Sequence, residues 1–271
     1  MQQPLKNTVL VGPSPRIAVD YLGAGQPIIF LHGIGGNRLN WARAMAALSP
    51  QFLVMAWDAR GYGASDDYPG ALTDDDFIAD LARVLDHFEI DQCHIVGLSM
   101  GVSIAIDFFD QHPDRVKSLV FSGGSTEDGH TAKKDRETYL KSRLEPLLNG
   151  ADPADRAGEM LNSLIADTSN KTVVQEAVQS LRALRRDSYI KSMQCYAATQ
   201  GRSHKFAKVT VPALGIVGEL DRLTTPENMA ELVALIPGAE LKIISAAGHL
   251  PNIEQPEKFN QILHDFLINV K

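Results

Sequence analysis

A serine between two glycines is the residue in this chain best suited to chemistry. Ser99 is the centre of a Gly-x-Ser-x-Gly pentapeptide that extends from Gly97 to Gly101. The apolar run 94–98 precedes it and an apolar helical pattern follows it, which predicts a sharp strand-to-helix turn. Such a turn exposes the serine hydroxyl at the sheet edge, and glycine is needed where strand and helix cross closely. We therefore predict that Ser99 is a nucleophile; a serine that only caps the helix is the alternative.

A serine hydroxyl needs a base to take its proton and a third group to orient that base. Downstream of Ser99 the sequence offers Asp221, in Gly-Glu-Leu-Asp, and His249, in Gly-His-Leu-Pro. Both follow strand patterns, so they would lie at the carboxyl edge of a parallel sheet, where ligands bind. We predict that His249 transfers the proton and that Asp221 orients it. The alternative acids are Glu127 and Asp128, and the alternative role of Asp221 is a helix cap or a salt bridge.

The negative charge that develops on an attacked carbonyl oxygen requires two hydrogen-bond donors. The candidates are the backbone N–H groups of Met100, directly after the nucleophile, and of Ile34, in the glycine-rich loop 32–37. His32 and Gly33 begin this loop, and we expect both beside the substrate. His32 is expected to order the loop through hydrogen bonds rather than to take part in the chemistry.

Strand and helix patterns alternate around these residues. Strands are predicted at 8–11, 17–22, 27–31, 52–57, 94–98, 116–121, 213–218 and 240–244, and helices at 41–48, 73–88, 226–235 and 256–270. This order is typical of an α/β fold in which helices cover both faces of a mostly parallel sheet.

The stretch 125–206 shows helical patterns and no strand-like run. We predict that it forms a helical lid on a core made of 1–124 and 207–271. Arg182, Arg185 and Arg186 are expected to share one side of a lid helix. A solvated helix face is the favoured interpretation, and a clamp for a substrate carboxylate is the alternative.

Composition excludes several function classes. The 271 residues carry a net charge of −7 and no basic run, so we expect no nucleic-acid partner. Residues 1–6 lack the regions of a signal peptide and no apolar stretch is long enough to span a bilayer, so we expect a cytoplasmic protein with no membrane partner. Neither the two cysteines nor the histidines show metal-ligand spacing, and no metal is expected. The oligomeric state is not indicated.

Five motifs together resemble those of the α/β-hydrolase family. They are His-Gly at 32–33, Asp-x-Arg-Gly-x-Gly-x-Ser at 58–65, Gly-x-Ser-x-Gly at 97–101, Gly-Glu-x-Asp at 218–221 and Gly-His at 248–249. The resemblance covers nearly the whole chain except the lid, and it is greatest to 3-oxoadipate enol-lactonases and small carboxylesterases. It implies an eight-stranded, mostly parallel sheet with helices on both faces and a helical lid inserted after the sixth strand.

Two residues depart from the family pattern. Val102 stands where many relatives carry a second glycine, which predicts tighter packing behind the nucleophile. Leu250 follows His249 where carbon–carbon bond hydrolases of meta-cleavage pathways tend to carry tryptophan, and this weakens the resemblance to them. Asp58 and Arg60 are expected to hold neighbouring loops together.

The sequence thus predicts a serine hydrolase that cleaves a small-molecule ester or lactone of a small carboxylic acid through an acyl-enzyme, with no cofactor. The first alternative is hydrolysis of a carbon–carbon bond in a dioxo acid by the same three residues. The second is a hydrolase-like ligand sensor with slow turnover.

Overall fold

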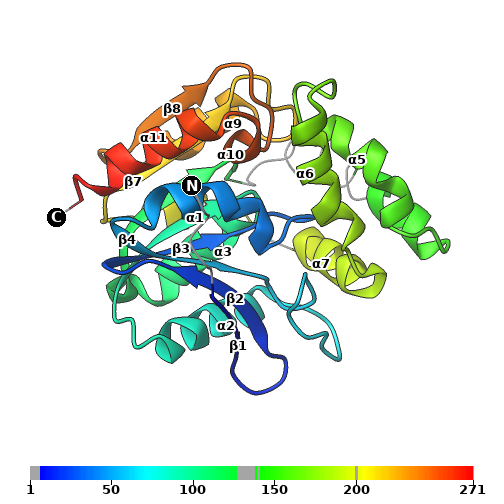
Figure 1. The fold of residues 1–271 in the computed structure, drawn as a ribbon, viewed down its shortest axis with the longest axis horizontal. Helices are drawn as coiled ribbons and strands as arrows, with labels where there is room; N and C mark the ends of the chain where they lie inside the picture. The colour runs from blue at the N-terminus through cyan, green and yellow to red at the C-terminus, as the bar shows by residue number, and fades with distance from the viewer. Residues whose placement is uncertain (1–6, 127–137, 139–140, 199–200, 271) are drawn as a thin grey trace.

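The computed structural model describes residues 7–126, 138, 141–198 and 201–270, and an eight-stranded sheet runs through them (Figure 1). The strands lie in the order β1-β2-β4-β3-β5-β6-β7-β8. The first two form an antiparallel hairpin beside β4, and from β4 to β8 all neighbouring strands are parallel. The bounds are β1 (Asn7–Val11), β2 (Ile17–Leu22), β3 (Gln26–Leu31), β4 (Phe52–Trp57), β5 (Cys93–Leu98), β6 (Val116–Ser122), β7 (Ala213–Gly218) and β8 (Glu240–Ile244).

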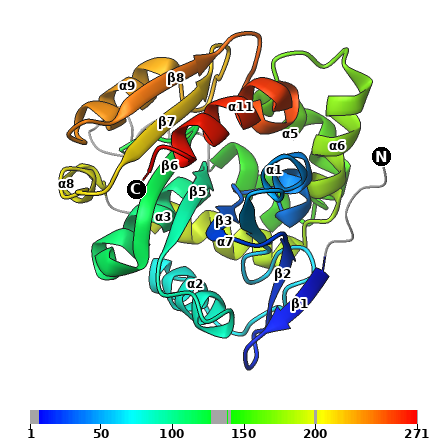
Figure 2. The same cartoon turned by 60° about the vertical axis from the view of Figure 1, so that its left-hand side comes forward.

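Helices cover both faces of the sheet, as predicted. One hydrophobic cluster joins the sheet to α2 (Asp74–His87), α3 (Met100–Gln111) and α9 (Pro226–Ala234). A second cluster joins the other face to α1 (Ala42–Leu48) and α11 (Pro256–Leu267). In Figure 2 the strands lie between α3 on one side and α1 on the other. Every residue of β5 is buried, because a central parallel strand is covered from both faces.

Two helix boundaries differ from the prediction. The helix predicted at 41–48 is preceded by a 3-10 helix (Arg38–Trp41), whose N-terminus is capped by Asn37. A short helix not predicted, α10 (Pro251–Glu254), comes before α11, which ends at Leu267 rather than near Val270.

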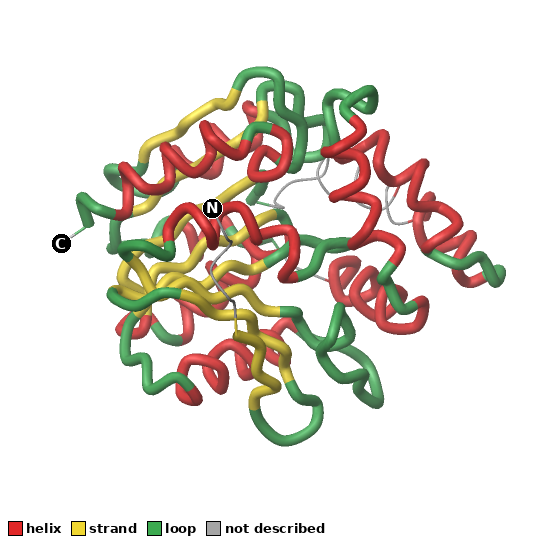
Figure 3. The backbone as a smooth tube through the Cα atoms, in the orientation of Figure 1, coloured by secondary structure: helices red, strands yellow, loops and turns green. Residues whose placement is uncertain are grey.

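The chain between β6 and β7 is helical in its described part, in agreement with an insertion after the sixth strand. It contains a 3-10 helix (Ala154–Arg156), α5 (Ala157–Leu164), α6 (Lys171–Arg182), α7 (Arg186–Ala198) and α8 (Ser203–Phe206). Helices α5, α6 and α7 form a layer at one end of the molecule, on the right in Figures 1 and 3. We call residues 141–198, which include this layer, the cap; the predicted bounds of the insertion, 125 and 206, stay a prediction.

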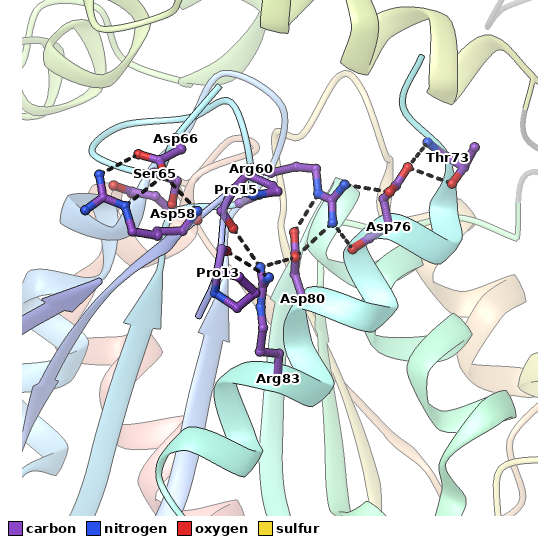
Figure 4. Close-up of polar contacts among 12 residues, drawn as sticks. Pro13, Pro15, Asp58, Arg60, Ser65, Asp66, Thr73, Asp76, Asp80 and Arg83 are labelled. Carbon is purple, nitrogen blue, oxygen red and sulfur yellow. Dashed lines mark hydrogen bonds and ion pairs between the residues drawn. The ribbon is translucent and has the colours of Figure 1, made fainter. Parts of the chain in front are cut away.

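The loop after β4 is held to α2 by charged side chains, as expected for Asp58 and Arg60 (Figure 4). The Arg60 guanidinium donates from Nε to Asp80 Oδ2 at 2.7 Å and from Nη2 to Asp80 Oδ1 at 2.9 Å. Asp58 is fully buried and accepts the backbone N–H of Ala64 at 2.7 Å and that of Arg38 at 2.7 Å. This network holds the loop after β4 in place, and helix α7 of the cap contacts this loop.

No helix in the described part of the chain is long and apolar enough to cross a membrane.

Candidate active site

Ser99 lies at the turn between β5 and α3, where the sequence predicted it. Its backbone has φ 54° and ψ −114°, a conformation that non-glycine residues rarely adopt. A Cβ on Gly97 would collide with the carbonyl oxygen of Gly101, and a Cβ on Gly101 would collide with that of Leu31. The two glycines therefore permit the close crossing of strand and helix that holds the Ser99 side chain at the sheet edge.

Asp221 and His249 form a buried pair beyond the ends of β7 and β8. His249 Nδ1 lies 2.8 Å from Asp221 Oδ2, and Thr224 donates its hydroxyl to the same oxygen at 2.9 Å. The other oxygen, Oδ1, accepts the backbone N–H groups of Leu223 and Thr224 at 2.8 and 3.0 Å. With four donors, the carboxylate is fixed in orientation and its charge is compensated.

The pKa shifts of Asp221 and His249 favour proton transfer to His249. Burial raises the pKa of Asp221. The His249 charge and the surrounding hydrogen-bond donors lower this pKa by a larger amount, so the net pKa is below its usual value. Burial lowers the pKa of His249, but the charge and hydrogen bond of Asp221 outweigh it, so the net pKa is above 6.5. Asp221 thus stabilises the imidazolium form of His249.

Ser99 and His249 line the same pocket. The described residues form no hydrogen bond with the Ser99 hydroxyl. Hydrogen bonds between nucleophile and base are often loose without substrate. An added Cβ on Gly123 would lie 3.2 Å from His249 Nδ1, which shows how closely the end of β6 supports the ring.

The loop after β3 lies directly against the nucleophile. A Cβ on Gly33 would come within 2.9 Å of Ser99 Cβ, so only glycine fits there. Ile34 follows and lines the pocket, and no backbone acceptor is recorded for its N–H in the described chain. Met100 is the first residue of α3, where an N–H precedes the first helical hydrogen bond. Both N–H groups predicted to bind an oxyanion therefore flank Ser99.

His32 is engaged in holding this loop. Its Nε2 accepts the backbone N–H of Ala59 at 3.0 Å, so the ring proton is on Nδ1, which donates to the Gly33 carbonyl at 2.9 Å. Burial lowers the pKa of His32, which keeps the ring neutral. The ring is buried and both nitrogens are occupied, which agrees with an ordering role.

The pocket has a largely apolar wall. Leu164 and Leu181 come from the cap, and Leu98, Trp41 and Leu250 from the core. A small polar wall consists of Asn40, Ser180 and Asn252, linked by hydrogen bonds from Asn40 Nδ2 to Ser180 Oγ and from Asn252 Nδ2 to the Asn40 carbonyl. No lysine or arginine is among the described residues that line the pocket.

The prediction that three arginines share one helix side is wrong. Helix α6 ends at Arg182 and α7 begins at Arg186, because the chain turns between them with Leu184 packed inward. Arg185 donates to the carbonyl oxygens of Gly63 and Ser65, and Arg186 donates to that of Leu147. None of the three lines the pocket.

Other predicted features have clear positions. Val102 is buried and packs closely behind the nucleophile, because a Cβ on Gly124 would lie 2.8 Å from its Cγ1. The alternative acids Glu127 and Asp128 lie outside the described residues.

Sequence reasoning missed five side chains near the site, which are Asn40, Ser180, Thr224, Asn252 and Glu254. Thr224 follows Asp221 by three residues, and Asn252 and Glu254 follow His249 by three and five, so this closeness in sequence was a usable signal. Asn40 and Ser180 carry no such signal, because they come from a 3-10 helix and a cap helix far apart in the sequence.

Comparison with known proteins matches residues 26–256 to the alpha/beta hydrolase fold. The chain is 31% identical over 274 residues to 2-hydroxy-6-oxononadienedioate/2-hydroxy-6-oxononatrienedioate hydrolase of Paraburkholderia phymatum, covering 96% of this chain and 94% of that protein. It is 29% identical over 248 residues to 3-oxoadipate enol-lactonase 1 of Acinetobacter baylyi, covering 90% and 89%. A thermophilic esterase from Thermogutta terrifontis, solved with malate bound, superimposes with a TM-score of 0.86 at 25% identity, covering 98% and 99%.

Proposed function

This chain belongs to the alpha/beta hydrolase fold family, and we propose that it is a serine hydrolase that cleaves an ester or lactone of a small carboxylic acid through an acyl-enzyme. Membership in the family confirms the resemblance inferred from the five motifs, and the similarity to known hydrolases supports hydrolysis as the general reaction. The observation that carries the proposal is the buried Asp221–His249 pair in one pocket with Ser99. The proposed reaction needs no cofactor.

The proposed mechanism follows from these positions. His249 takes the proton of the Ser99 hydroxyl through Nε2 while the oxygen attacks the carbonyl carbon of the substrate. The N–H groups of Ile34 and Met100 bind the resulting oxyanion; one such donor typically contributes on the order of 10²–10³ in rate. The imidazolium then returns its proton to the leaving alcohol oxygen, and water repeats the sequence on the acyl-enzyme. Asp221 keeps Nδ1 protonated throughout.

The pocket wall favours a neutral or weakly polar substrate. Its apolar side chains suit a short acyl or alcohol group, and Asn40, Ser180 and Asn252 offer a single polar patch. A dicarboxylate such as the dienedioate in the name of the Paraburkholderia relative would bury two negative charges, and no lysine or arginine is among the described lining residues. The lack of lysine and arginine among the described lining residues therefore supports an ester or lactone over a dicarboxylate.

The second candidate is hydrolysis of a carbon–carbon bond in a dioxo acid. It is favoured by the similarity to the Paraburkholderia hydrolase over nearly the whole chain. It predicts slow turnover of simple esters and fast turnover of a vinylogous diketone.

The test is hydrolysis of short-chain p-nitrophenyl esters by the wild type and by Ser99→Ala, with both the burst and the steady state followed. We expect steady turnover in the wild type and a loss of at least about 10⁴-fold in the variant, because the covalent step is removed. A 2-hydroxy-6-oxo-dienoate is assayed in parallel to compare the two candidates.

Three results would each decide between alternatives. Faster turnover of the dienoate than of every ester would favour the carbon–carbon bond hydrolase. A stoichiometric burst without turnover would mean that deacylation is blocked, as expected of a ligand sensor. Full activity in folded Ser99→Ala would exclude the serine mechanism.

A further inference from the structure

Glu254, the last residue of α10, accepts backbone hydrogen bonds from two different segments. Its Oε1 accepts the N–H groups of Gly248 at 2.8 Å and Leu250 at 3.2 Å. Its Oε2 accepts the N–H of Ala166, which comes from the cap, at 2.7 Å. One carboxylate therefore holds the residues on both sides of His249.

The same cap segment also contacts His249 directly. The backbone N–H of His249 donates to the Leu164 carbonyl at 2.8 Å. An added Cβ on Gly248 would lie 2.8 Å from Ala166 N and 3.0 Å from Leu164 O, so the two backbones touch along this stretch. The segment 164–166 and the His249 loop thus form one unit, with Glu254 at its centre.

A charged oxygen pair suits this position better than any neutral side chain. Three N–H donors converge on two acceptor oxygens, and an amide has only one acceptor. Burial raises the pKa of Glu254, and the charge of Asp221 raises it as well. The three N–H groups lower this pKa by a smaller amount, so the net pKa is above its usual value. Because hydrogen bonds to a carboxylate are stronger than neutral ones, the loop gains rigidity from the charge.

We propose that Glu254 is a positioning residue, which fixes the backbone on both sides of His249 and joins it to the cap segment 164–166, so that the imidazole is held toward Ser99. This inference rests on the proposed function. Glu254 contacts neither the substrate pocket nor the reacting atoms, and it acts through the His249 backbone.

The experiment compares Glu254→Gln with Glu257→Gln, a change at an exposed glutamate three residues further along the chain. In Glu254→Gln the amide group faces at least one N–H donor, and we expect kcat to fall on the order of 10²-fold with KM nearly unchanged, because a small displacement of a reacting group is costly. Glu257→Gln should behave as the wild type.

Two further readouts separate positioning from a merely structural role. The carboxylates of Asp221 and Glu254 both raise the pKa of His249, so the acid limb of kcat/KM should move to lower pH in Glu254→Gln. The low-field proton resonance of the His249–Asp221 hydrogen bond should broaden or shift. If this variant does not fold, Glu254→Asp replaces it: the charge stays, the shorter side chain no longer spans both segments, and kcat should still fall.

Wild-type kcat, pH limb and proton resonance in a folded Glu254 variant would overturn the inference. This result is distinguishable from failure of the proposed function. If Ser99→Ala is inactive while the Glu254 variant is unaffected, only the positioning role is wrong. If Ser99→Ala is fully active, the serine mechanism itself is wrong.

Discussion

The sheet edge below the pocket and the cap above it hold their residues in place by different means. At the sheet edge, backbone touches backbone: a Cβ on Gly97, Gly101 or Gly218 would collide with a carbonyl oxygen of a neighbouring segment. In the described cap, a Cβ added at Gly150 or Gly158 would meet no atom of another segment within 4 Å. Apart from the segment 164–166, whose backbone touches the His249 loop, the cap is attached through side chains, and many residue types can make such contacts.

The loop after β4 is one place where side chains attach the cap. Helix α7 lies on that loop, with Ser188 Oγ donating to Asp67 at 2.7 Å and Lys191 Nζ donating to the Tyr68 carbonyl at 2.7 Å. The Lys191 ammonium also lies 4.6 Å from the centre of the Tyr68 ring, a cation–π contact. In the proposed reaction the sheet edge carries the chemistry and the cap selects the substrate, and we expect the sheet edge to tolerate fewer substitutions than the cap.

The largest effect is expected at the sheet edge. Asp221→Asn should lower kcat about 10⁴-fold for every ester, because an amide no longer holds the His249 ring in the tautomer that accepts the Ser99 proton. The rates for short and long esters should fall by the same factor, measured as kcat over a series of p-nitrophenyl esters. Unequal losses would show that the sheet edge also selects the substrate.

The alternative acids supply the control for this prediction. Glu127→Gln and Asp128→Asn should each retain wild-type kcat. If one of them loses activity to the extent expected for Asp221→Asn, the assignment of the orienting acid is wrong.

A smaller and more selective effect is expected in the cap. Leu164 lines the pocket, and Leu164→Ala should change the ratio of kcat/KM for long against short esters by about tenfold, since one or two methylenes of pocket space change affinity by this order. Leu148→Ala is the matched control, because Leu148 is a cap leucine with a side chain 60% exposed. A uniform fall for all esters in Leu164→Ala would contradict the division between the two regions.

The difference between the sheet edge and the cap also explains which parts of the site could be predicted from the sequence. Ser99, Asp221, His249 and the loop at Gly33 were predicted at their places because backbone crossing leaves only glycine as an option around them, and this constraint is visible as a motif. The pocket wall of Asn40, Ser180 and Asn252 was not predicted, because it arises only when three distant segments pack together. The turn between α6 and α7 was missed because Leu184 packs inward, a tertiary contact that helical periodicity does not show.

The smallest effect concerns the attachment of the cap. Arg185 is partly exposed and donates from Nη2 to the Ser65 carbonyl at 2.8 Å and from Nη1 to the Gly63 carbonyl at 3.3 Å. Arg185→Ala should lower the free energy of unfolding by about 1 kcal/mol, the usual size for such hydrogen bonds. Arg182 is exposed at the end of α6, and Arg182→Ala should change stability by less than about 0.5 kcal/mol.

Urea denaturation of the two variants, with kcat/KM for one ester measured alongside, tests this pair of expectations. Since neither arginine lines the pocket, both variants should keep kcat/KM within about twofold, a change of less than about 0.5 kcal/mol in activation free energy. A larger loss of stability in Arg182→Ala than in Arg185→Ala would mean that the cap is not anchored on the loop after β4. A selective loss of activity toward a carboxylate-bearing ester in Arg182→Ala would instead support the hypothesis of a clamp for a substrate carboxylate. It would place this guanidinium next to the substrate when the site is occupied.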